Sequence, residues 1–345
     1  MQNEFGRLAL ACGVRAFIAV GLILVGSHLA QAGPHSGRGK AEAAASGCPA
    51  IAAPPYAGPI FDAMAQTDQS LDAEAALATA RAEGVVKLAL FARVHRHQDG
   101  RGLVDHLAAK YPDFIVRGAP KEWDMPRDLP SIYIDEVLAG VASGHFRFVG
   151  EIIYTEGNKG EGEVTEGGER YTDPTLPGTK HLLDGLAGTG IPVMMHWEAY
   201  SWARDWPHFD RLYSAYPNQI FVLPHLAFAS HDQAAEVLAA HPNVWATISK
   251  KDKDNVNLVD EDKEEETGES LVDECSQLKP EWRDLLVRYS TRLMFATDAH
   301  KERRWVQYVE IIRRWRAILG QLPPDVAAAI AHGNAERLYR SPIGN

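Results

Sequence analysis

Residues 59–68, Pro-Ile-Phe-Asp-Ala-Met-Ala-Gln-Thr-Asp, begin with an apolar run and end in polar residues. They open a series in which short apolar runs alternate with longer helical patterns. Eight runs read as strands: residues 60–64, 86–94, 114–116, 146–152, 192–196, 220–225, 244–248 and 293–297. The helical patterns include residues 71–82, 102–109, 181–186, 209–216, 232–240 and 281–289. Strands that alternate with helices form parallel βαβ units. Eight such units predict a closed (β/α)8 TIM barrel, a single α/β domain over residues 59–341.

An open, doubly wound α/β sheet is the alternative fold for the same alternation. Such a sheet usually carries a glycine-rich phosphate-binding turn after its first strand. Residues 64–68 are not such a turn, which favours the barrel. Residues 33–58 are rich in glycine, alanine, serine and proline and read as a linker that precedes it.

The first 32 residues have the organisation of a secretory signal peptide. Arg7 and Arg15 precede an apolar run at residues 16–26. After this run, Ala30-Gln31-Ala32 is a small-x-small cleavage site. The run has the length of a signal-peptide core, about 7–15 residues, and is shorter than the ~20 residues of a spanning helix. We therefore expect cleavage after Ala32, a periplasmic or secreted chain, and no stable membrane insertion. An uncleaved membrane anchor is the alternative.

The net charge and the cysteine content limit the kinds of partner and of covalent cross-link that the chain can have. The chain has 345 residues and a net charge of −11, which argues against general nucleic-acid binding. Cys48 and Cys275 remain after the expected cleavage and can pair in an oxidising compartment. Cys48 also follows Ala-Ser-Gly, as in a lipid-attachment site, but a polar stretch separates it from the apolar run.

Four ionisable residues stand at the carboxyl ends of predicted strands. Glu151 ends the fourth strand, His196 the fifth, His225 the sixth, and Asp298 follows the eighth. In a TIM barrel these ends meet at the catalytic face. Singly, a strand-end histidine is more often structural, and an aspartate there can cap a helix. Together, four such groups are too costly to bury as packing alone, so we expect a functional site.

The order of these motifs resembles that of the amidohydrolase-related family of metal-dependent TIM-barrel hydrolases. The matching segments are the fifth-strand His196, the sixth-strand His225-Leu226, the eighth-strand Thr297-Asp298-Ala299 and residues 332–339. The resemblance implies that a first-strand His-x-His pair and the eighth-strand aspartate hold one metal. A fourth-strand carboxylate and the two later histidines would hold another.

The first strand departs from that pattern, because Met64 and Gln66 occupy the two histidine positions. Methionine is a soft, poor ligand for zinc, and glutamine offers only a neutral oxygen. One metal site is therefore expected to be lost, which leaves Glu151, His196 and His225. Two imidazoles and one carboxylate with an open position suit catalytic zinc, and iron or manganese would also fit.

The resemblance implies metal-assisted hydrolysis of an ester, lactone or amide bond in a small molecule, with Asp298 as general base. Three alternatives stay open. The protein can be a metal-free, inactive barrel that acts as a binding protein, a decarboxylase or hydratase of the same family, or a metal-independent lactonase. The sequence does not indicate the substrate or an oligomeric state.

Arg93, His95, Trp197 and His300 are candidates for substrate binding near the strand ends. His95 begins a His-x-His that lies past the second predicted strand, but taking it as the family motif would leave seven strands. A polar turn before residues 98–101 is the simpler interpretation. The tryptophans at residues 197–206 form either an aromatic wall for substrate or ordinary packing. Two polar insertions, residues 155–180 and 250–276, follow strands and are either solvated loops or part of a lid or acidic rim.

Overall fold

The computed structural model describes residues 47–339 except 96, 123–127, 158–169, 250, 253–268 and 301. Cys48–Asn345 is a compact unit. The predicted signal peptide, most of the predicted linker, and much of both polar insertions lie outside the described residues. No helix within the described part of the chain is long and apolar enough to cross a membrane.

All eight predicted strands are present, and each pairs in parallel with its neighbour in its sheet. They are β1 (Ile60–Thr67), β2 (Val85–His95), β4 (Ile115–Arg117), β6 (Val149–Ile153), β9 (Val193–His196), β10 (Phe221–Leu223), β11 (Val244–Thr247) and β12 (Leu293–Met294). Two short strands, β3 (Gln98–Asp99) and β5 (Lys121–Glu122), add to β2. β7 (Thr155–Glu156) and β8 (Arg170–Tyr171) form an antiparallel pair within the first insertion.

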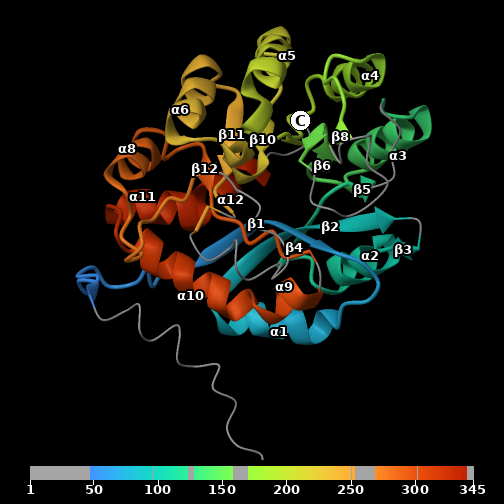
Figure 1. The fold of residues 1–345 in the computed structure, drawn as a ribbon. Helices are drawn as coiled ribbons and strands as arrows, with labels where there is room; N and C mark the ends of the chain where they lie inside the picture. Colours follow the sequence, from blue (N-terminus) through green and yellow to red (C-terminus); the bar gives the residue numbers. More distant parts are fainter. Residues whose placement is uncertain are drawn as a thin grey trace, which may run out of the picture. The chain divides into compact units, whose positions relative to one another are not determined.

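Backbone hydrogen bonds join the strands into a barrel. One sheet contains β1, β2 and β4, and the other has the order β12-β11-β10-β9-β6. Ala119 N donates to Phe148 O at 2.9 Å, which connects the end of β4 to β6. Ala63 N donates to Phe295 O at 3.1 Å, which connects β12 to β1. The fold is thus the predicted TIM barrel, with its helices arranged around the strands (Figure 1).

The six predicted helices are confirmed; four have ends within two residues of the prediction, while α4 begins four residues and α5 seven residues earlier than predicted. They are α1 (Ala73–Ala82), α2 (Arg101–Lys110), α4 (Pro177–Leu186), α5 (Trp202–Ala215), α6 (His231–Ala240) and α8 (Pro280–Arg288). Side chains that cap the first turn determine where some of these helices begin. Asp72 accepts the Ala75 N–H at the start of α1, and Ser230 forms a capping box with Gln233 at the start of α6.

Further helices complete the layer. They are α3 (Ser131–Ala142), α9 (Glu302–Val306), α10 (Tyr308–Leu319), α11 (Pro324–Ala328) and α12 (Asn334–Tyr339), with short turns η2 (Ala199–Ser201), η3 (Pro224–Phe228) and η4 (Ala329–Gly333). α10 is amphipathic and buries Trp315, which packs edge-on against Phe295. α12 places Tyr339 under the barrel, where its hydroxyl donates to Ala63 O at 3.0 Å.

The barrel interior is apolar below the carboxyl ends of its strands. Met64 is fully buried there, in one cluster with side chains from β2, β9, β10 and β12. Phe91 and Phe148 pack edge to face with centroids 5.9 Å apart. Met64 therefore contributes packing to the core, while the polar residues of the next layer form the site described below.

A disulfide joins Cys48 to Cys275, with Cα atoms 5.3 Å apart. The predicted possibility that these cysteines pair is confirmed. The bond links the segment before β1 to the segment between β11 and α8. It also uses the sulfur that a lipid attachment at Cys48 would need, so that interpretation is not compatible with this structure.

Candidate active site

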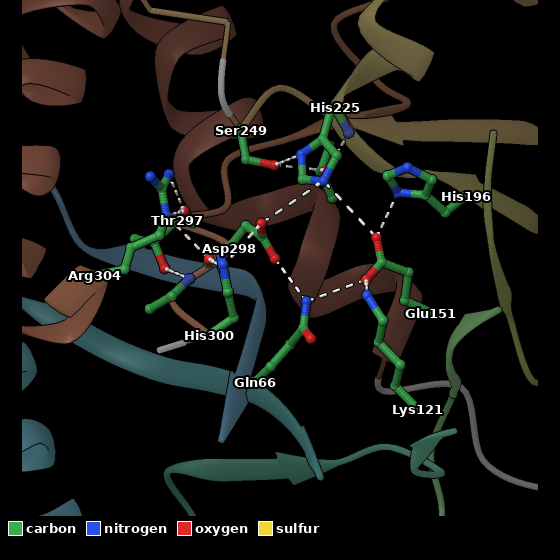
Figure 2. Close-up of polar contacts among 12 residues, drawn as sticks. Gln66, Lys121, Glu151, His196, His225, Ser249, Thr297, Asp298, His300 and Arg304 are labelled. Carbon is green, nitrogen blue, oxygen red and sulfur yellow. Dashed lines mark hydrogen bonds and ion pairs between the residues drawn. The ribbon is translucent and has the colours of Figure 1, made fainter. Parts of the chain in front are cut away.

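The four residues singled out at strand ends converge on one buried cluster. Glu151 lies in β6, His196 ends β9, His225 follows β10 in η3, and Asp298 follows β12. Each exposes 4% or less of its surface. Figure 2 shows their side chains directed toward one another from four separate strands. The barrel topology thus brings together residues that are up to 147 positions apart in the sequence.

Glu151 is the centre of this arrangement. Its Oε1 lies 2.7 Å from His196 Nδ1 and 3.8 Å from His225 Nε2. One ligand atom from each of the three residues lies within 4.8 Å of the others. Asp298 approaches from the opposite side, with Oδ2 3.8 Å from His225 Nε2. Two imidazoles and a carboxylate at such separations can bind one divalent metal.

The second nitrogen of each histidine is held by a side-chain oxygen. His196 Nε2 lies 3.2 Å from Glu198 Oε1, and His225 Nδ1 lies 2.7 Å from Ser249 Oγ. Histidines that bind metal usually donate their other N–H in this way, which fixes the ring and the tautomer. The donor set and its orientation therefore fit a metal ion.

The backbone is strained at two of the four residues. His225 has φ 56° and begins a run of left-handed residues through Phe228, and Asp298 has φ 51°. None of them is glycine, and such conformations cost about 1–3 kcal/mol each. Specific contacts hold both positions. His225 N donates to Thr247 Oγ1 at 3.1 Å, and Arg304 Nε donates to the Asp298 carbonyl oxygen at 3.0 Å. The left-handed turn lets the chain reverse after β10 while its histidine faces the cluster.

Two further side chains contact the carboxylates. Gln66 Nε2 donates to Asp298 Oδ1 at 2.7 Å and to Glu151 Oε2 at 3.1 Å. Lys121 Nζ donates to the same Glu151 Oε2. Ionised carboxylates only accept hydrogen bonds, so the amide turns its nitrogen toward them.

The charges of the cluster are strongly coupled. Burial alone would raise the pKa of Glu151, but Lys121 and His196 beside it hold that pKa well below its usual range. Burial alone would lower the pKa of His196, but Glu151 and then Glu198 raise it above the ordinary histidine value. In the absence of metal, Glu151 is thus held in its carboxylate form and His196 binds a proton more readily than an ordinary histidine, so a metal would compete with that proton.

Comparisons with known proteins agree with this geometry. The family model described as amidohydrolase matches residues 52–341. The chain belongs to the amidohydrolase family. Its members are enzymes, which agrees with the expectation of an enzyme. No match was found among curated proteins.

Solved structures similar to this chain share its fold at low identity. An uncharacterised TIM-barrel protein from Bordetella bronchiseptica is 17% identical, with a TM-score of 0.52 over 77% of this chain and 81% of that one. A 2,6-dihydroxybenzoate decarboxylase is 12% identical, with a TM-score of 0.50 over 82% and 98%. A Pseudomonas putida protein assigned as a 2-pyrone-4,6-dicarboxylic acid hydrolase is 17% identical, with a TM-score of 0.51 over 77% and 86%.

The candidates for substrate binding lie in different places. His300 is next to the cluster, with Nδ1 2.7 Å from the Asp298 carbonyl oxygen. Arg93 NH1 donates to the His300 carbonyl oxygen at 3.2 Å. His95 is exposed on the β2–β3 hairpin, which is the polar turn preferred above. These contacts place His300 beside Asp298 and Arg93 beside His300, while His95 lies on an exposed hairpin.

Trp197 lies on the other side of its strand. Its side chain is fully buried, stacks on Phe209 with centroids 4.7 Å apart, and donates through Nε1 to Tyr213 at 3.2 Å. Trp202 and Trp206 continue the stack. The tryptophan cluster is therefore packing between the barrel and α5, as the second of the two interpretations held. It does not place Trp197 in the polar cluster.

Three residues of the candidate site were missed by sequence reasoning: Lys121, Glu198 and Ser249. Glu198 and Ser249 each stand two residues after a barrel strand, so alternation along the chain could have indicated both. Lys121 lies in β5, four residues past the end of β4, and its own sequence context carries no comparable signal.

Proposed function

We propose that this protein is a hydrolase that uses one divalent metal, zinc in the first place and iron or manganese as further options, held by Glu151, His196 and His225. Its substrate would be a small molecule with an ester, lactone or amide bond. The observation that carries the proposal is the orientation of both histidines. Each turns one nitrogen toward Glu151 while Glu198 or Ser249 holds the other.

The chemistry that a metal supplies at this position is that of a Lewis acid, which polarises a carbonyl oxygen and acidifies water. Asp298 would serve as the general base. Gln66 holds its Oδ1, so Oδ2 is the oxygen that faces His225. It would take a proton from the water that attacks the carbonyl carbon and pass it to the leaving oxygen or nitrogen as the bond to carbon breaks.

Metal content measured on protein purified without chelator tests the assignment. The wild type should carry one ion per chain, and His196→Ala and His225→Ala should carry none. His106→Ala is a matched control, because His106 is exposed on α2. A folded His196→Ala protein with full metal content would refute the ligand set. A panel of lactones, esters and amides then identifies the bond that is cleaved.

A second candidate rests on the Lys121–Glu151 contact. Lys121 neutralises Glu151 without any metal, as expected in a metal-independent lactonase or in a barrel that only binds a ligand. Wild-type protein that stays metal-free in excess zinc and hydrolyses lactones would favour the metal-independent lactonase. Metal-free protein without activity would favour the binding protein. Release of carbon dioxide, or addition of water to a double bond, would indicate a decarboxylase or hydratase instead.

We also propose that the chain is exported through its N-terminal segment to the periplasm or beyond. The Cys48–Cys275 disulfide supports this, because such bonds form and persist in oxidising compartments. Fractionation of a bacterial host that expresses the full chain tests the proposal, and recovery of an uncleaved protein from the membrane fraction would refute it.

A further inference from the structure

Two nitrogen atoms lie on the side of Glu151 and Asp298 that faces away from the proposed metal position. We propose that Gln66 and Lys121 act together as a built-in substitute for a second metal ion and keep this site a one-metal site. The proposal extends the proposed function and rests on it for the metal ion held by Glu151, His196 and His225. It makes Gln66 and Lys121 positioning residues for the two carboxylates.

The first argument is how the contacts divide each carboxylate. Gln66 Nε2 bonds Asp298 Oδ1 at 2.7 Å and Glu151 Oε2 at 3.1 Å. The remaining oxygens, Asp298 Oδ2 and Glu151 Oε1, are those that lie 3.8 Å from His225 Nε2. One nitrogen atom therefore bridges the two carboxylates as a metal ion would. Figure 2 shows this nitrogen between them.

The second argument is the unsatisfied oxygen of the same amide. Gln66 is 2% exposed, and its Oε1 has no hydrogen-bond partner in the described part of the protein. A buried acceptor without a partner is unfavourable. The amide nevertheless keeps this orientation, because turning it over would place Oε1 against two carboxylate oxygens. The contacts of Nε2 with Glu151 and Asp298 thus determine how Gln66 lies.

The third argument is charge. Two buried carboxylates that share one neutral amide repel each other, because Coulomb interactions are strong in a buried site. Lys121 is 5% exposed and supplies a positive charge on the same Glu151 Oε2 that Gln66 contacts. The amide provides the bridge and the ammonium provides the charge. Neither residue alone provides both properties of a cation, so the two are expected to act as a pair.

The proposal predicts that removing both nitrogens opens a second metal site. In the double variant Gln66→His/Lys121→Met, the new imidazole, Asp298 and the released Glu151 Oε2 would offer three protein ligands, enough for zinc. After saturation with zinc and desalting, mass spectrometry of the metal should find one more ion per chain than in the wild type. Gln66→His alone and Gln66→His/Lys121→Arg are matched controls, because a cation still occupies Glu151, and neither should gain an ion.

The outcomes separate this proposal from the proposed function. A gain of one ion only in variants with a neutral residue at position 121 supports the proposal that Gln66 and Lys121 replace a second metal ion. This holds whether the wild type binds one ion or none. A wild type without metal refutes the one-metal hydrolase by itself. A folded double variant that gains no metal ion overturns the proposal that Gln66 and Lys121 replace a second metal ion. A full gain in Gln66→His alone overturns the part assigned to Lys121. If Lys121→Met prevents folding, Lys121→Gln makes the same test with a polar neutral side chain.

Discussion

Replacing Glu198 by glutamine should weaken zinc binding although Glu198 is not one of the proposed ligands. Its two oxygens have separate partners. Oε1 lies 3.2 Å from His196 Nε2, and Oε2 accepts the Gly157 N–H at 2.8 Å. Glutamine has one acceptor oxygen, so it can keep only one of these contacts. The other partner would then face an NH2 group.

The magnitude follows from the contact that is lost. A hydrogen bond to a charged group contributes about 1.5–3 kcal/mol, and ~1.4 kcal/mol corresponds to a factor of ten. The expected loss in zinc affinity is therefore about 10- to 100-fold, the range usual for residues that orient a metal ligand. The loss should be largest at alkaline pH, where protons do not compete for His196.

The pH dependence has a definite sign. Burial lowers the pKa of His196, but Glu151 and then Glu198 raise it above the ordinary value. Removing the Glu198 charge lowers that pKa, so protons compete with zinc only at lower pH in the variant. As pH falls, wild-type affinity should decline first, by about tenfold per pH unit for this proton. The difference in zinc affinity between the wild type and Glu198→Gln should therefore become smaller as the pH falls.

Competition with a zinc-binding dye, measured from alkaline to mildly acidic pH, tests this reasoning. Glu236→Gln is a matched control, because Glu236 lies on α6 and accepts a hydrogen bond at 2.8 Å from Trp206, which is not a proposed metal ligand. An unchanged affinity in a folded Glu198→Gln protein would show that the contact with His196 does not orient the ring. A loss that is constant with pH would show that Glu198 does not influence the His196 proton.

Three other predictions follow from the same structure. Asp298→Asn should keep its metal and lose about 10²–10⁴-fold in turnover, the usual contribution of a general base; turnover at the wild-type rate would contradict this. The double variant Cys48→Ser/Cys275→Ser should lose about 5 kcal/mol of unfolding free energy by the chain-entropy estimate for a loop of 227 residues. Guanidinium unfolding measures that loss, and equal midpoints would mean that the bond adds no stability. N-terminal sequencing of exported protein should find Gly33 first, and any other start would move the cleavage site.

The positions of the strands and of four site residues could be predicted because each leaves a local signal. An apolar run followed by an ionisable residue marks both the strand and its carboxyl end, and parallel topology then gathers those ends. Trp197 shows the limit of this reading. It follows His196 directly, so alternation along a strand places it on the opposite face, and chemical character alone was a poor guide to its role.

Other features depend on contacts between distant residues. Lys121 reaches Glu151 because β5 pairs with the far end of β2, and nothing near Lys121 in the sequence records that pairing. The left-handed backbone from His225 to Phe228 opposes the preferences of non-glycine residues, so local propensity could not predict it. The direction of the Gln66 amide is likewise set by charges on β6 and after β12.

The Cys48–Cys275 bond also bears on how the protein must be made. In the export proposed above, an unfolded chain that crosses the membrane with its amino end leading would deliver Cys48 long before Cys275. The covalent ring can close only after Cys275 has followed, when seven of the eight barrel strands have already been delivered. Synthesis in a reducing cytoplasm would leave the ring open. Preparations for enzymology should therefore be made under oxidising conditions, with both thiols shown to be oxidised before any assay is interpreted.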